Sequence, residues 1–259
     1  MSIHPTAVVS SKASLGEGVS IGPYAVLEER VVLGPGCRVD AHTVIQGSTT
    51  VGAHCHFFPF CSIGFPPQDL KHQEGESTEL VVGNHNVFRE YVTVNRGTSE
   101  GGGRTCIGDY NFIMAYGHIA HDCSLGNHIL LANAATLAGH VSIADNATIG
   151  AFSGIHQFCR VGTYGFVGGY SVITKDVLPY SKTVSTREAK NYGVNVIGLE
   201  RRGFSADAIR MIRAAYRVLL QSDLNTSQAL DQLKENFSGH PKVQAMIDFI
   251  ESSQRGVIK

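Results

Sequence analysis

The sequence lacks an excess of charge of either sign. It contains 21 lysine and arginine residues against 22 aspartate and glutamate residues, and only 17% of its residues are charged. Proteins that bind nucleic acid or anionic membrane surfaces do so through clustered cationic side chains. We therefore do not expect nucleic acid as a partner.

Long hydrophobic runs are also missing. None of the 259 residues lies in an apolar stretch of about 18 residues, the length that spans a bilayer. The first residues, Met1 to Pro5, show no basic segment leading into an apolar one, as a secretory signal would. We expect no membrane span and a cytoplasmic protein.

Glycine, in contrast, is abundant, with 29 residues. Glycine accepts the positive φ angles that many tight turns require. This composition favours a fold that turns often and regularly, which makes a search for internal repeats the next step.

A repeat of six residues dominates the chain. An apolar residue recurs at every sixth position from Ile3 to Ile63, again from Val82 to Val94, and again from Ile107 to Ile173. A mostly small residue follows four positions later. A helix repeats every 3.6 residues and cannot give this period. Each hexad is interpreted as a short strand and a turn, whose apolar side chain is buried against neighbouring turns.

The cysteines fit the same pattern. Five of the six occupy the small-residue position, and the sixth, Cys106, is expected in a loop. Cysteine at such a position is interpreted as a small buried apolar residue, and the absence of a CxxC motif argues against a disulfide or a zinc site. The five are Cys37, Cys55, Cys61, Cys123 and Cys159.

The breaks in the hexads divide the chain. They predict loop insertions near 65–81 and 99–106, and the hexads end before residue 185. Beyond that point the apolar period becomes 3.6, with a helix capped by Ser205 and further helices over 225–236 and 241–253. Gly203, before the first of these helices, and Gly239, between the last two, are the expected breaks. We predict a mainly β domain over 1–184 and a C-terminal helical domain over 185–259.

The hexads resemble those of the hexapeptide-repeat acyltransferases, whose left-handed parallel β-helix takes three hexads, or 18 residues, per coil. With that coil, residues 18 apart stack about 4.8 Å from each other. His121 then lies next to Gly139, and Asp122 next to His140. One corner of three successive coils is predicted to gather His118, His121, Asp122, Gly139, His140, His156 and Gln157.

Two kinds of chemistry suit this corner. A neutral imidazole can act as a general base, with Asp122 fixing its tautomer, and the N–H of Gly139 can stabilise an oxyanion. Histidines from neighbouring coils also hold zinc in γ-type carbonic anhydrases. Spacing alone does not decide between them.

Longer motifs make the resemblance more specific. The strings QDLK at 68–71, HIAHDC at 118–123, LAGHV at 137–141, HQFC at 156–159 and RRGF at 201–204 occur in this order. Together they resemble the acyl-[acyl-carrier-protein]–UDP-N-acetylglucosamine O-acyltransferase family. The resemblance implies transfer of a 3-hydroxyacyl group from acyl carrier protein to UDP-N-acetylglucosamine, the first step of lipid A synthesis. It also implies no cofactor or metal, and a homotrimer with active sites between subunits.

The same resemblance implies roles for individual residues. His121 would be the general base, Asp122 its orienting partner and Gly139 the oxyanion donor. Gly169 would leave room for a long acyl chain. Contacts to the substrates are implied for Gln68, Asp69, Lys71, His118, His140, His156, Gln157, Gly169, Asn195, Arg201 and Arg202.

Several alternatives stay open at this stage. Asp69 and Lys71 could form an exposed ion pair of little energetic value, and Arg201 and Arg202 could compensate a helix dipole. Ile197 stands where some relatives carry glutamate, which puts the contact to the uracil in doubt. Some family members acylate the 3-amino analogue of the sugar nucleotide, and γ-type carbonic anhydrase is the alternative from another class.

Overall fold

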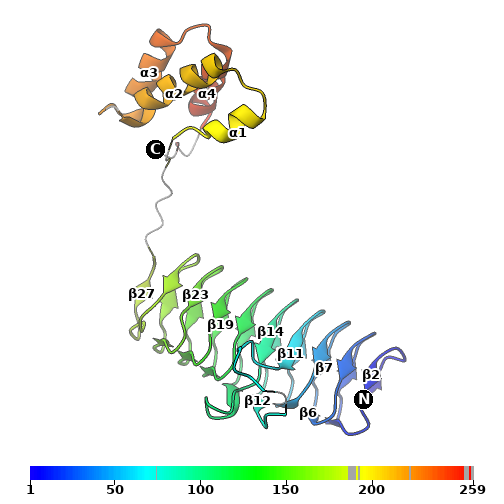
Figure 1. Ribbon diagram of the computed structural model, residues 1–259. Coiled ribbons are helices and arrows are strands. Elements are labelled where there is room, and N and C mark those ends of the chain that lie inside the picture. The colour runs from blue at the N-terminus through cyan, green and yellow to red at the C-terminus, as the bar shows by residue number, and fades with distance from the viewer. Residues whose placement is uncertain (74, 186–190, 192, 222, 254–256, 258–259) are drawn as a thin grey trace. The chain divides into compact units, whose positions relative to one another are not determined.

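The protein forms two compact units, Met1–Arg187 and Glu188–Lys259. The structure is a computed structural model (Figure 1) and describes all residues except 74, 186–190, 192, 222, 254–256 and 258–259. Unit 1 contains the strands and unit 2 the helices. Each unit is described below by itself.

Unit 1 is a parallel β-helix built from three parallel sheets. The first sheet consists of β1 (Ser2–Ile3), β4 (Ser20–Ile21), β7 (Arg38–Val39), β10 (His56–Phe57), β13 (Val87–Phe88), β16 (Phe112–Ile113), β19 (Leu130–Leu131), β22 (Thr148–Ile149), β25 (Phe166–Val167) and β27 (Lys182–Thr183). The second consists of β2 (Val8–Val9), β5 (Val26–Leu27), β8 (Val44–Ile45), β11 (Ser62–Phe65), β14 (Thr93–Asn95), β17 (His118–Ile119), β20 (Thr136–Leu137), β23 (Gly154–Ile155) and β26 (Val172–Ile173). The third consists of β3 (Ser14–Leu15), β6 (Val31–Leu33), β9 (Ser48–Val51), β12 (Glu79–Val82), β15 (Arg104–Ile107), β18 (Ser124–Leu125), β21 (Ser142–Ile143) and β24 (Arg160–Val161).

The register follows the hexads. Paired residues are 18 apart in the sequence where nothing is inserted, as in Ser20 with Arg38. The separation is 31 residues across the first insertion, from His56 to Val87, and 25 across the second, from Val87 to Phe112. The insertions therefore leave the pairing of the coils intact.

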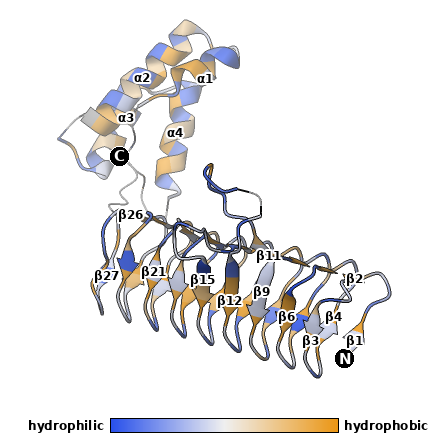
Figure 2. Cartoon of the chain, turned by 60° about the horizontal axis from the view of Figure 1, so that its bottom comes forward, coloured by the Kyte–Doolittle hydropathy of each residue, from blue (hydrophilic) through white to orange (hydrophobic). Residues whose placement is uncertain are grey.

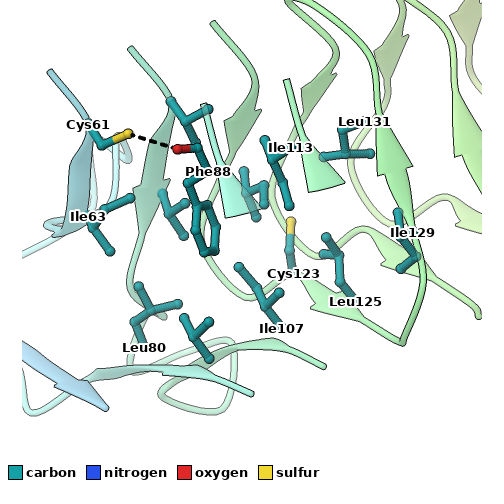
Figure 3. Close-up of a cluster of buried hydrophobic side chains, with 14 of the residues drawn as sticks. Cys61, Ile63, Leu80, Phe88, Ile107, Ile113, Cys123, Leu125, Ile129 and Leu131 are labelled. Carbon is teal, nitrogen blue, oxygen red and sulfur yellow. Dashed lines mark hydrogen bonds between the residues drawn. The ribbon is translucent and has the colours of Figure 1, made fainter. Parts of the chain in front are cut away.

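The hexad apolar residues form the core. All of them from Ile21 to Ile173 are buried, whereas Ile3, Val9 and Leu15, at the N-terminal end of the stack, are not. Figure 3 shows Ile63, Phe88 and Ile113 from successive coils side by side, and the rings of Phe57 and Phe88 stack at 4.9 Å. Since each side chain is covered by the coils on both sides, the core is a column of layers.

The turns correct the expectation for glycine. Most turn residues with positive φ are not glycine; Tyr24 (57°) and His42 (59°) are examples. Their side chains form outward columns, in which the rings of Tyr24, His42, Phe60, Tyr91 and Tyr116 stack at 5.0–5.1 Å. Many glycines instead lie where backbones approach closely: a Cβ on Gly34 would meet the carbonyl carbon of Gly52 at 2.6 Å.

Both insertions project from the coils of unit 1 at the same corner, where the chain passes from a strand of the second sheet to a strand of the third. The first lies between β11 and β12 and the second between β14 and β15. The first is shorter than predicted, because β12 begins at Glu79, and the second lies at 96–103 instead of 99–106, because β15 begins at Arg104. The strands β12 and β15 pair over four residues. Cys106 therefore lies in a strand, so its assignment to a loop was wrong. Figure 2 shows a largely hydrophilic loop projecting near β11.

Unit 2 is a small helical bundle. Its helices are α1 (Val196–Arg201), α2 (Ala206–Gln221), α3 (Thr226–Asn236) and α4 (Pro241–Glu251). Ser205 accepts a hydrogen bond from the N–H of Ala208, which confirms the predicted cap, and α2, α3 and α4 share a core around Ala215, Leu233 and Ile247. Among the described helices, none is both long and apolar enough to cross a bilayer.

Candidate active site

The corner that carries the insertions also carries the predicted catalytic residues. We call it the site corner; its turns contain His121 and Asp122 after β17, Gly139 and His140 after β20, and Gln157 after β23. These strands belong to successive coils of the second sheet. The 18-residue coil therefore predicted correctly which turns are neighbours.

His121 and Asp122 form a hydrogen-bonded pair. The Nδ1 of His121 lies 2.7 Å from Oδ2 of Asp122, and the Asp122 side chain is only 1% exposed. An ionised carboxylate can only accept hydrogen bonds, so Nδ1 carries the hydrogen and Nε2 keeps its lone pair. This is the tautomer that a general base needs.

Asp122 has further donors that the sequence did not indicate. The N–H of Thr98 donates to Oδ1 at 2.9 Å, and the hydroxyl of Thr98 donates to Oδ2 at 2.7 Å. The N–H of Asp122 itself donates to Oγ1 of Thr105 at 2.8 Å. Thr98 comes from the second insertion, where the hexad register gives no position, and Thr105 comes from β15, which the sequence had assigned to that insertion.

Gly139 packs directly against the His121 ring. A Cβ at position 139 would lie 2.6 Å from Cε1 and 2.8 Å from Nε2 of that ring. Any side chain there would have to displace the imidazole. Within the described part of the chain, the N–H of Gly139 has no hydrogen-bond acceptor, which leaves it available to a ligand.

The remaining histidines differ in their surroundings. The ring of His140 lies edge-on to His121 at 5.3 Å, and its Nε2 is 3.6 Å from Oδ2 of Asp122. His156 and Gln157 are exposed on the next coil. Among the described contacts, His156 Nδ1 faces only the carbonyl oxygen of Gln157, at 3.2 Å. The described contacts thus join His121, Asp122 and His140, and His156 lies in the turn of the next coil at the same corner.

His118 lies three residues before His121, in β17. Its Nδ1 is 2.7 Å from the hydroxyl of Thr93 in the neighbouring strand β14. Burial, with a smaller contribution from His121, lowers the pKa of His118. A neutral His118 can exchange hydrogen bonds with a hydroxyl-bearing ligand without adding a charge beside His121.

The two insertions contact each other beside the dyad. Glu76 in the first accepts hydrogen bonds from the N–H and the hydroxyl of Ser99 in the second, at 3.1 and 2.9 Å. Hydrogen bonds from the main chain of Gln73 and from Ser99 lower the pKa of Glu76 to about 2. A cavity of about 270 Å³ lies between the insertions and is lined by residues that include Asp69 and Lys71.

The implied sugar contacts of the first insertion lie at this cavity or beside it, with Lys71 exposed and Asp69 partly buried. Oδ1 of Asp69 accepts a hydrogen bond from the main-chain N–H of Lys71, and Nζ of Lys71 lies 3.6 Å from Glu100. The alternative of an ion pair between Asp69 and Lys71 is therefore wrong. Gln68 is exposed on the same loop.

Gly169 has a structural reason for its identity. A Cβ there would lie 2.8 Å from the carbonyl oxygen of Ala151, in the preceding coil. Close approach of two backbones thus requires glycine, whatever the space outside the coil. The predicted role in acyl-chain length is a separate matter.

Three of the implied substrate contacts belong to unit 2. Asn195 caps α1 by accepting a hydrogen bond from the N–H of Gly198 at 3.1 Å. Arg201 ends α1, and the guanidinium of Arg202 donates to the carbonyl oxygen of Gly198 at 3.3 Å. This contact is what the dipole alternative predicts for Arg202. Ile197 is exposed on the same helix.

Among the residues that the structure describes, one group has the composition of a metal site. His121, Asp122 and His140 each offer a ligand atom, and these atoms lie within 4.8 Å of one another. However, both oxygens of Asp122 already accept hydrogen bonds, from Thr98 and from His121. The geometry is that of a hydrogen-bonded dyad with a neighbouring histidine.

Comparison with known proteins gives consistent matches. The family model described as UDP N-acetylglucosamine O-acyltransferase, domain 2, matches residues 176–258. The acyl-[acyl-carrier-protein]–UDP-N-acetylglucosamine O-acyltransferase of Syntrophobacter fumaroxidans is 45% identical over 259 residues, covering all of both chains. The protein of that name from Halorhodospira halophila is 49% identical over 257 residues, covering 99% of both chains.

A solved structure agrees. LpxA from Acinetobacter baumannii has a TM-score of 0.70 and 40% identity, covering 99% of both chains. The predicted fold class, a left-handed parallel β-helix followed by helices, is confirmed by this likeness together with the three parallel sheets.

Proposed function

The chain belongs to the family of acyl-[acyl-carrier-protein]–UDP-N-acetylglucosamine O-acyltransferases, and on this premise we propose that it transfers a 3-hydroxyacyl group to the 3-hydroxyl of UDP-N-acetylglucosamine. It is an acyltransferase, its acyl donor is a 3-hydroxyacyl thioester on acyl carrier protein, and the reaction is the first step of lipid A synthesis. The observation that carries the chemistry is the bond from His121 to the buried Asp122, at the corner from which both insertions leave.

In the reaction, Nε2 of His121 takes the proton of the sugar hydroxyl as its oxygen attacks the thioester carbonyl carbon. A carbon–oxygen bond forms, and the carbonyl electron pair moves to the oxygen. Gly139 is positioned as a donor to this oxyanion, because its N–H has no acceptor in the described chain; one such donor contributes about 10²–10³ in rate. The carbon–sulfur bond then breaks, and His121 returns its proton to the departing thiolate of phosphopantetheine.

Asp122 supports both steps. Its carboxylate holds the Nδ1–H of His121 and stabilises the imidazolium that forms during proton transfer. The 1% exposure of its side chain keeps water away from this bond. Nothing in this chemistry calls for a cofactor or a metal beyond the donor's own phosphopantetheine.

The proposed substrate contacts divide between the two units. In unit 1, Gln68, Asp69 and Lys71 would hold the sugar together with His118, and His140, His156 and Gln157 would border the acyl chain and the nucleotide. Gly169 would leave space for a long chain. In unit 2, Asn195, Arg201 and Arg202 would contact the nucleotide or phosphopantetheine; guanidinium groups suit phosphate.

The proposed assembly is a cytoplasmic homotrimer with each site between two copies. The site corner supports this, because both insertions and the exposed residues His156 and Gln157 extend outward there. Light scattering on the purified protein tests the assembly directly. A monomer with full activity would contradict it.

The decisive experiment incubates the protein and a His121→Ala variant with UDP-N-acetylglucosamine and 3-hydroxyacyl carrier proteins of several chain lengths. Mass spectrometry detects the acylated sugar nucleotide. Product from the wild type and at least 10²-fold less from the variant, as expected for loss of a general base, would support the proposal. Product only with the 3-amino sugar nucleotide would overturn the choice of acceptor, and no product from either would overturn the function.

The pH dependence of the rate is a second test. A protonated imidazole has no lone pair with which to accept the hydroxyl proton. The rate of the wild type should therefore fall as the pH is lowered below neutrality. A rate that is constant between about pH 5 and 8 would count against a histidine base.

A further inference from the structure

A segment of the second insertion lies over the catalytic carboxylate. It runs from Gly97 to Gly103, and we call it the strap. Thr98 in the strap is 7% exposed, and both its N–H and its hydroxyl donate to the Asp122 carboxylate, at 2.9 and 2.7 Å. Two of the three hydrogen bonds that reach this carboxylate within 3 Å therefore come from one residue outside the hexads.

The direction of the Thr98 hydroxyl is fixed. The N–H of Gly101 donates to Oγ1 of Thr98 at 3.0 Å. This occupies an acceptor position of the hydroxyl, and the partner on the other side, the Asp122 carboxylate, can only accept. The hydroxyl hydrogen is therefore directed at Oδ2, the same oxygen that His121 contacts.

Gly101 allows the strap to lie this close. A Cβ on Gly101 would overlap the Asp122 carboxylate. Its φ lies outside the positive range, so space and not backbone conformation requires glycine here.

The strap is held at several points. The N–H of Gly103 donates to the carbonyl oxygen of Thr98 at 2.7 Å, and that of Gly97 to the carbonyl oxygen of Glu79 at 3.2 Å. Ser99 is bound by the carboxylate of Glu76 in the first insertion. These bonds fix Thr98 from both sides, so the geometry of its donors is set before substrate arrives.

We propose that Thr98 is a positioning residue for the catalytic dyad, with Gly101 providing the space it needs. Thr98 holds the Asp122 carboxylate in the orientation that binds Nδ1–H of His121, and thereby keeps Nε2 of His121 aimed at the sugar hydroxyl. The inference rests on the proposed function and deepens it. It assigns the second insertion a part in catalysis that is distinct from substrate contact.

The test compares two substitutions of Thr98 that differ in whether the hydroxyl is kept. Thr98→Val removes the hydroxyl donor and keeps the side-chain shape, whereas Thr98→Ser keeps the hydroxyl. In the acyl-transfer assay we expect kcat of Thr98→Val to fall about 10- to 100-fold, the range for a hydrogen bond to a charged group. The KM for UDP-N-acetylglucosamine should stay within about twofold, and Thr98→Ser should retain most of kcat.

A matched control comes from another corner. Thr163 donates its hydroxyl to the carbonyl oxygen of Asp145 at 2.8 Å, so Thr163→Val also removes one threonine hydrogen bond. It should leave kcat unchanged. Thermal unfolding of each variant shows whether it is folded, and Gly101→Ala, which crowds the carboxylate while keeping Thr98, gives a second measurement and should also lower kcat.

The outcomes separate the inference from the function. If the wild type is active and folded Thr98→Val keeps its kcat, the role of Thr98 is overturned. If Thr98→Val does not fold, an unchanged kcat in folded Gly101→Ala overturns it. Equal losses in Thr98→Val and Thr98→Ser also overturn it, because the hydroxyl would not matter. A wild type that is inactive with every donor and acceptor refutes the proposed function itself.

Discussion

At the scale of single residues, the contact between Gly139 and His121 gives the sharpest prediction. In Gly139→Ala the new Cβ would lie 2.6 Å from Cε1 of His121, so the imidazole must move. A shift of about 1 Å in a catalytic group can cost about 10² in rate. We expect kcat to fall by roughly that factor, measured in the acyl-transfer assay, with little change in thermal stability.

Gly154→Ala is the matched control for this substitution. Gly154 lies in β23, and a Cβ there meets nothing within 4 Å. It should keep wild-type kcat. If Gly139→Ala kept the wild-type kcat, the close packing of Gly139 on the imidazole of His121, the proposed base, would be contradicted.

The sequence predicted part of this site. An 18-residue coil was enough to place His121 beside Gly139 and Asp122 beside His140, because the register is regular there. It could not place Thr98 or Glu76, because both lie in insertions where residue number no longer gives position. His156 directly follows β23 at the same corner, and its Nδ1 lies 3.2 Å from the carbonyl oxygen of Gln157.

At the scale of elements, buried asparagines tie coils together. Oδ1 of Asn111 accepts from the N–H of Ile129 at 2.8 Å, and its Nδ2 donates to the carbonyl oxygen of Gly126 at 3.0 Å. Asn111→Ala would leave both groups without a partner, at a cost of about 2 to 4 kcal/mol. We expect the melting temperature to fall by roughly 4 to 16 °C, measured by calorimetry.

Asn133→Ala serves as the comparison, since Asn133 is exposed in a turn of the same kind of coil. It should change the melting temperature by little. If Asn111→Ala behaved like Asn133→Ala, water would have to replace both bonds of the buried amide.

The link between the insertions should depend on pH. The pKa of Glu76 is lowered from 4.5 to about 2 in the folded protein, so its carboxylate stabilises the fold above about pH 4.5, and this contribution is lost as the pH falls toward 2. Glu76→Gln should therefore unfold at lower urea concentration than the wild type at pH 7. The difference should shrink between pH 4.5 and 2.

A control for the pH series is Glu17→Gln, at an exposed turn. It should show no comparable difference at any pH. A gap between Glu76→Gln and wild type that stays constant down to pH 2.5 would contradict the lowered pKa.

Elements were predicted well where a period persists. The hexads gave the strands, and the 3.6 period gave α2, α3 and α4. Both predicted breaks have positive φ: Gly203 lies just before α2, and Gly239 lies between α3 and α4. The six-residue helix α1 is too short to show a period. The aromatic columns were missed because glycine was expected at positive φ; stacking of neighbouring rings accompanies tyrosine, histidine and phenylalanine at those turns.

At the scale of the whole molecule, the β-helix should be least stable at its N-terminal end. Ile3 is 43% exposed, and Val9 and Leu15 are only partly buried, whereas Ile21 is 3% exposed. The first coil is covered by another coil on one side only. Hydrogen exchange followed by mass spectrometry should show amides of residues 2–15 exchanging at least tenfold faster than those of residues 112–155.

Uniform exchange along unit 1 would contradict this gradient and indicate that the first coil is covered in the assembled protein. The dyad lies well inside the stack, between β17 and β18. Fraying of the first coil should therefore leave His121 and Asp122 in place.

The insertions also have a consequence for how this protein can change. Paired strands keep their register although one connection spans 31 residues and the next 25, and each doubling of loop length costs only about 0.6 kcal/mol. The length and composition of the first insertion can therefore drift during evolution, or be exchanged by grafting, without retuning the layered core. The second insertion is held against Asp122 by Thr98 and Gly101, and the first is tied to it through Glu76. On the proposed function, the sugar contacts of the first loop can therefore diversify around a fixed Glu76 while the second loop keeps its contact to the dyad.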